Sequence, residues 1–96
     1  MAKVYVIKHL SRDLKWNRES TYIDGVFKTL DSARHEIEKM RDEYRANKDI
    51  TILGEHWSLD DCPYYYVNYI ENYYKEYDPE RMTAVEYDFE EFELAD

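Results

Sequence analysis

The segment that most constrains the fold is PYYYVNYIENYYKEYD, residues 63–78, which has seven tyrosines within fourteen residues. Tyrosine favours strands. The polar side chains, however, recur at steps of three, one, three and one, which forms a single stripe on a helix and scatters over both faces of a strand. These polar residues are Asn68, Glu71, Asn72, Lys75 and Glu76. Giving the period more weight than the propensity, we predict a helix from Pro63 to Tyr77.

A second helix is predicted to begin after Thr29. Its apolar residues recur at steps of three and four and therefore lie on one face. They are Leu30, Ala33, Ile37, Met40 and Tyr44. The Thr29 hydroxyl can accept a hydrogen bond from a backbone N–H at the helix start, and Asn47 is a suitable end.

Two strands are predicted before this helix, from Lys3 to Leu10 and from Ser20 to Lys28, joined by a polar connection. The apolar run VYVI in the first indicates a strand in the middle of a sheet. Residues 50–53 are either a short strand or an extended connector, and the sequence leaves both open.

The segment 83–94 is predicted to be a strand with one irregularity. Its apolar residues alternate as far as Phe89 and then continue out of phase at Phe92 and Leu94. A β-bulge at Glu90-Glu91 restores the alternation. The bulge also collects the carboxylates on one outward face, namely Glu86, Asp88, Glu90 or Glu91, and Glu93.

These elements predict one α+β domain, residues 1–96, because a chain this short seldom supports two cores. We expect a small antiparallel sheet of about three strands in the order 2-1-3, with two helices packed on one face. The acidic last strand would then lie at a sheet edge. Charge on an edge strand also prevents edge-to-edge aggregation, which is a purely structural explanation for the same carboxylates.

The net charge of −9 is unevenly distributed along the chain. Residues 1–48 hold eleven basic and eight acidic residues, whereas residues 49–96 hold two basic and fourteen acidic residues. Such asymmetry attracts basic surfaces and repels nucleic acid from the acidic half. Acidity also keeps a tyrosine-rich protein soluble, so composition alone leaves a functional and a solubilising role open.

The residues that carry chemistry form no catalytic or metal-binding pattern. His9, His35 and His56 share no metal-ligand spacing, and Cys62 with His56 has no third group to orient a thiol–base pair. Two glycines cannot form a phosphate-binding loop. We therefore expect no enzyme, no cofactor and no metal.

Several kinds of partner and location are also disfavoured. The basic connection from Lys8 to Arg18 surrounds Trp16 and could contact phosphates, but the larger acidic charge opposes direct nucleic-acid binding. The longest uncharged run, residues 62–70, is too short to span a membrane. A single cysteine indicates no disulfide. We therefore expect the protein to be located in the cytoplasm of the host cell.

Three segments resemble a widespread group of short phage and bacterial proteins: KVYVI (3–7), DGVFKTLDSARHEIEKM (24–40) and YDFEEFELAD (87–96). Members of this group share a β-hairpin, a junction of the form GVF-x-(S/T)-x-x-x-A and a terminal acidic and apolar strand. The resemblance implies a β-β-α-β fold and a phage or mobile-element context, without functional residues.

Phage proteins of this size often inhibit host proteins, and small acidic inhibitors often occupy nucleic-acid grooves by imitating phosphate charge. The resemblance therefore implies a non-enzymatic phage-type inhibitor of a basic host nuclease of the CRISPR or restriction kind, an anti-defence role. It would bind through an acidic, tyrosine-rich surface. The expected contact residues are Glu71, Glu76, Asp78, Glu80, Glu86, Asp88, Glu90, Glu91 and Glu93, with Tyr65 and Tyr69.

The alternative hypothesis is a small-ligand, nucleotide-binding or sponge module. Tyrosine rings at a homodimer junction would stack on a nucleotide, and the basic connection would hold its phosphates. A structural accessory protein that works only as an oligomer is a third hypothesis.

Overall fold

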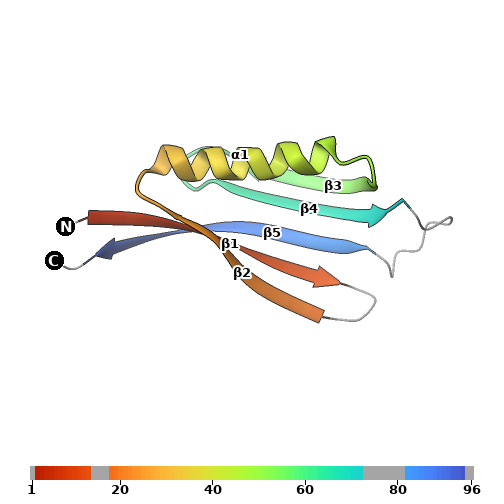
Figure 1. Cartoon of the computed structure of the whole chain (residues 1–96), viewed down its shortest axis with the longest axis horizontal. Helices are drawn as coiled ribbons and strands as arrows, with labels where there is room; N and C mark the ends of the chain where they lie inside the picture. Colours follow the sequence, from red (N-terminus) through yellow and green to blue (C-terminus); the bar gives the residue numbers. More distant parts are fainter. Residues whose placement is uncertain (1, 14–17, 73–81, 95–96) are drawn as a thin grey trace.

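The protein folds as one five-stranded antiparallel sheet with a helix on one face, seen in a computed structural model that describes residues 2–13, 18–72 and 82–94 (Figure 1). The spatial order of the strands is β2-β1-β5-β4-β3, which defines a mostly-β fold. The elements are β1 (Ala2–Asp13), β2 (Arg18–Phe27), α1 (Leu30–Ala46), β3 (Ile50–Ser58), β4 (Tyr64–Glu71) and β5 (Thr83–Leu94).

The predicted fold of about three strands with two helices is therefore wrong, and the tyrosine-rich segment is the reason. Residues 64–71 form strand β4, which pairs with β3 on one side and β5 on the other. Tyr65 and Val67 are completely buried at alternating positions, so burial has the period of a strand. Residues 73–77 of the predicted helix lie outside the described residues.

Helix α1 confirms the helix predicted after Thr29. The Thr29 hydroxyl accepts a hydrogen bond from the backbone N–H of Ser32 at 3.1 Å, and the backbone N–H of Asn47 donates to the carbonyl of Tyr44. Ala33 and Ile37 are completely buried on the face that packs against the sheet.

The last strand, β5, lies in the interior of the sheet and not at the predicted sheet edge. Strand β1 lies between β2 and β5. Strand β5 is not an edge strand, because β4 pairs with its first part, from Thr83 to Tyr87. The segment left open, residues 50–53, belongs to β3, which continues to Ser58.

The bulge predicted at Glu90-Glu91 is absent from β5. Its pairing with β1 runs without a shift from Ala2↔Leu94 to Asp13↔Thr83. The register shifts lie elsewhere, where Asp24 is the extra residue in β2 and Leu53 the extra residue in β3. Consequently Phe92 and Leu94 point to the opposite face from Phe89.

The core fills the space between α1 and one face of the sheet. Its buried members come from the helix and from three adjacent strands: Ile7, Ala33, Ile37, Tyr65, Val67, Val85 and Tyr87. Among the described residues α1 is the sole helix, so no described helix covers the other face. That second face is the helix-free face.

Candidate interaction surface

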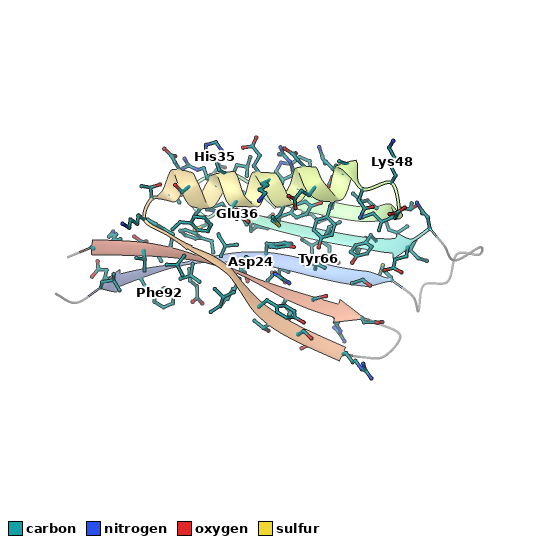
Figure 2. All side chains as sticks on the ribbon, in the orientation of Figure 1. Asp24, His35, Glu36, Lys48, Tyr66 and Phe92 are labelled. Carbon is teal, nitrogen blue, oxygen red and sulfur yellow. The ribbon has the colours of Figure 1, made fainter. Side chains whose placement is uncertain are left out.

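The helix-free face combines apolar, aromatic and charged side chains. Residues directly opposite each other on neighbouring strands share a face, so the register determines its membership. From β1 and β2 it includes Val4, Val6, Lys8, Leu10, Arg12, Ile23 and Val26. From β4 and β5 it includes Tyr64, Tyr66, Glu86, Asp88, Glu90, Phe92 and Leu94. Figure 2 shows Phe92 pointing away from α1.

The structure divides the predicted acidic stripe between two faces. Glu86, Asp88 and Glu90 lie on the helix-free face, while Glu91 and Glu93 alternate onto the face that bears α1. Of the remaining predicted carboxylates, Glu71 is exposed at the end of β4. Glu76, Asp78 and Glu80 lie outside the described residues.

The two tyrosines expected at the interface lie on the core side of the sheet. Tyr65 is completely buried, and its hydroxyl donates a hydrogen bond of 2.6 Å to the Glu55 carboxylate. Burial, together with this bond, raises the pKa of Tyr65. Tyr69 is half-buried and packs against the core, with its ring centroid 5.7 Å from that of Tyr44.

Two other tyrosines, Tyr64 and Tyr66, lie on the helix-free face. Tyr64 is 38% exposed. Sequence reasoning missed this pair because it assigned a helix to the segment. In a strand, the inward Tyr65 places both of its neighbours outward, so the alternation was the signal that could have found them.

Charge on the helix-free face is only partly compensated. Lys8 Nζ lies 2.7 Å from Glu90 Oε1, and this hydrogen bond raises the pKa of Lys8. Arg12 Nε lies 3.7 Å from Glu19. Within residues 2–13, 18–72 and 82–94, neither Glu86 nor Asp88 forms an ion pair. Lys8 lies directly opposite Asp88 and attracts it as well, but its ion pair is with Glu90, so acidic side chains outnumber basic ones at the centre of the face.

A hollow of about 270 Å³ opens on this face, lined by residues of β2, β1, β5 and β4 and by Met82 before β5. Its lining consists of Leu10, Arg12, Glu19, Tyr66, Met82, Ala84 and Glu86. A neighbouring hollow of about 310 Å³ is lined by Cys62, Pro63, Tyr64, Glu86, Asp88 and Phe89. Glu86 lines both hollows. Their volumes lie near the lower limit of typical small-ligand pockets, about 300 Å³, and suit single side chains of a partner.

The described residues hold no group of three or more histidine, cysteine or acidic side chains arranged for a metal ion. The closest approach to a catalytic pair is His9 Nδ1, 2.6 Å from Asp24 Oδ2. The His9 ring lies between the rings of Tyr22 and Tyr87, with both centroids 4.9 Å away. This packing accounts for the pair as a structural contact, and the absence of enzyme activity stays a prediction.

We compared the chain with protein-family models, with curated proteins and with solved structures, and none of the three comparisons found a match. The fold and the surface therefore characterise the protein without a relative: it is mostly β, and its described residues form one helix that covers one face of the sheet. No helix within the described part of the chain is long and apolar enough to cross a membrane.

Proposed function

We propose that the protein is a non-enzymatic, phage-type inhibitor that binds a basic, nucleic-acid-binding host protein through the helix-free face of its sheet. The observation that carries the proposal is the position of Glu86 and Asp88. Both carboxylates lie at the centre of the helix-free face without an ion pair to a described residue, although Lys8 lies directly opposite Asp88, and both line hollows large enough for a side chain. The partner class includes CRISPR and restriction nucleases in the host cytoplasm.

The chemistry of this face favours lysine and arginine as the contacting groups. Carboxylates at the centre of an interface pair with cationic side chains and steer a basic surface during encounter. Such contacts weaken as salt increases, because ions screen charges separated by more than about 10 Å at 0.1 M. Tyr64 and Tyr66 flank the carboxylates and supply the aromatic contact area typical of binding hot spots.

The alternative of a nucleotide-binding module has less support from the structure. It needs tyrosine rings free to stack at a dimer junction, but Tyr65 and Tyr87 are buried in the core and Tyr69 packs against it. The described tyrosines that lie on the helix-free face flank carboxylates, which repel phosphate.

The test reverses charge at the centre of the face. Partners captured from host lysate by the wild-type protein are identified, purified and titrated with the variant Glu86→Lys/Asp88→Lys at low and high salt. A matched control, Asp42→Lys/Glu43→Lys, makes the same charge change on the exposed surface of α1, away from the sheet. We expect the first variant to weaken binding by tenfold or more, about 1.4 kcal/mol, and the control to stay within about twofold.

Circular dichroism of both variants establishes that the fold is retained. Undiminished binding by Glu86→Lys/Asp88→Lys, or an equal loss in both variants, contradicts binding through the helix-free face. An equal loss would indicate that only the total charge of the chain matters.

A further inference from the structure

The second half of β5 has one side along which no strand of the described residues pairs. Strand β4 pairs with β5 only from Thr83 to Tyr87, and the next residue that could pair, Tyr64, follows Pro63. Proline has no N–H and ends a ladder. From Asp88 to Leu94, β5 therefore pairs with β1 on one side and with no described strand on the other. Figure 1 shows the ends of β1 and β5 extending past β3 and β4. We call residues 88–94 the free β5 edge.

The side chains of this edge differ between its two faces. On the helix-free face, Phe92 and Leu94 are 46% and 48% exposed. They adjoin Val4, which lies directly opposite Phe92. On the other face are Glu91 and Glu93, both exposed. Glu91 Oε1 lies 2.9 Å from Lys3 Nζ, whereas Glu93 forms no ion pair with a described residue. From residue 91 to residue 94, the helix-free face of the edge is thus apolar and the other face acidic, whereas Asp88 and Glu90 add carboxylates to the helix-free face nearer the centre of the sheet.

We propose that the free β5 edge binds an extended segment of a partner as an added strand, and that this segment alternates basic and apolar residues. Open strand edges take up such segments through main-chain hydrogen bonds, while side chains at alternate positions supply specificity. The apolar side chains of the segment pack on Phe92 and Leu94. Its lysine or arginine side chains lie beside Glu91 and Glu93 on the opposite face.

A second copy of the chain fits this edge poorly. Two free β5 edges paired with each other would bring Asp88, Glu90, Glu91 and Glu93 of both copies together. Like charges placed opposite each other destabilise a strand pair. The same carboxylates that oppose self-pairing favour a cationic strand, which is why we assign a basic partner segment and not a dimer to this edge.

The proposal rests on the proposed function for the basic character of the partner, but its test uses a synthetic peptide. The peptide Lys-Val-Lys-Ile-Arg-Val-Lys places basic residues on one face of a strand and apolar residues on the other. A control peptide has the same composition with the apolar residues in one block. The measurements are the dissociation constant by fluorescence anisotropy and the hydrogen exchange of backbone amides.

We expect the alternating peptide to bind at least tenfold more tightly than the control peptide. Binding should slow exchange at least tenfold at those amides of residues 88–94 that do not bond to β1. Phe92→Ser/Leu94→Ser should weaken binding at least tenfold, while the matched control Ile23→Ser/Val26→Ser on β2 should not. Glu93→Lys, at an exposed position, should also weaken binding and is not expected to disturb the core.

Equal affinity for the two peptides, or new protection at the outer edge of β2 or β3, would overturn the proposal. The outcome is separable from that of the proposed function. Salt-dependent partner binding that needs Glu86 and Asp88, without protection of residues 88–94, leaves the proposed function standing and rejects strand addition. Protection of the free β5 edge by the peptide, without any salt-dependent binding of a host protein, supports strand addition and rejects the proposed function.

Discussion

Val4 and Phe92 lie directly opposite each other on β1 and β5, with both side chains on the face of the sheet that α1 does not cover. Phe92 is 46% exposed. Three positions earlier, Phe89 points to the other face, where it packs against the core and stacks on Tyr5 with a centroid distance of 5.6 Å. Two phenylalanines of one strand thus have opposite environments.

The first prediction compares these two phenylalanines. Because Phe92 buries only about half of its side chain, Phe92→Ala should lower the free energy of unfolding by about 1 kcal/mol. Phe89→Ala removes a packed ring and its stacking contact with Tyr5, and should lower the free energy of unfolding by roughly 2–3 kcal/mol. Urea unfolding of both variants measures the difference. A larger loss of unfolding free energy for Phe92→Ala than for Phe89→Ala would instead indicate that Phe92 faces the core, as a bulge at Glu90-Glu91 would require.

The second prediction concerns the buried hydroxyl of Tyr65. Its bond to Glu55 adds to the contacts of Arg45, whose Nη2 lies 2.7 Å from the same carboxylate. Tyr65→Phe keeps the ring and removes one charge-assisted hydrogen bond, so it should lower the free energy of unfolding by about 1–2 kcal/mol. Tyr22→Phe is the control, since the Tyr22 side chain is 53% exposed and should cost little.

The third prediction is a loss of stability in alkali. Burial raises the pKa of Tyr65, Tyr69 and Tyr87 above the ordinary value of 10.0. A raised folded-state pKa contributes stability that is complete below pH 10, where both states are protonated. It is lost as pH rises further, because the unfolded chain ionises first. The urea midpoint should fall between pH 9 and pH 11.

Absorbance at 295 nm should show the corresponding titration. Tyr65 and Tyr87, which are buried, should ionise only as the chain unfolds, so part of the absorbance change should coincide with unfolding. A single titration for all tyrosines at an unchanged urea midpoint would contradict the prediction.

The fourth prediction concerns Gly54, which lies opposite Asn68 in the β3–β4 pair. A Cβ at position 54 would lie 2.9 Å from Asn68 Oδ1, and the amide Nδ2 of Asn68 donates to the Tyr66 hydroxyl at 3.2 Å. Gly54→Ala should therefore displace the amide and cost about 1–3 kcal/mol in unfolding experiments. The double variant Gly54→Ala/Asn68→Ala should recover much of this loss, because the obstructing amide is gone.

The elements that could be predicted are those whose sequence pattern depends only on neighbouring residues of the chain. The amphipathic face and the cap at Thr29 are local, and α1 was found with both of its ends. Strand β4 depends on partners on both sides, one of them in β5, and no local pattern records them. The period of the polar residues therefore misled, and the strand propensity of the tyrosines was the better guide.

The candidate surface was predicted in part, and the error has a physical origin. Placing a bulge at Glu90-Glu91 assumed that every large apolar residue of β5 faces the core. Phe92 and Leu94 instead lie on the helix-free face, so the predicted stripe of carboxylates divides. A strand without a bulge keeps strict alternation, and exposed apolar residues are common at protein surfaces.

The position of β5 between β1 and β4 also determines when the sheet can be completed. Hairpins β1–β2 and β3–β4 join strands that are close in sequence, whereas β5 pairs with a strand from the far end of the chain. Closing so long a loop costs entropy before the contacts form, which slows folding. During synthesis both neighbours of β5 emerge before it, and each keeps an open edge until β5 arrives. Insertion of this strand should therefore be the slow step, and the period of greatest aggregation risk should end with it.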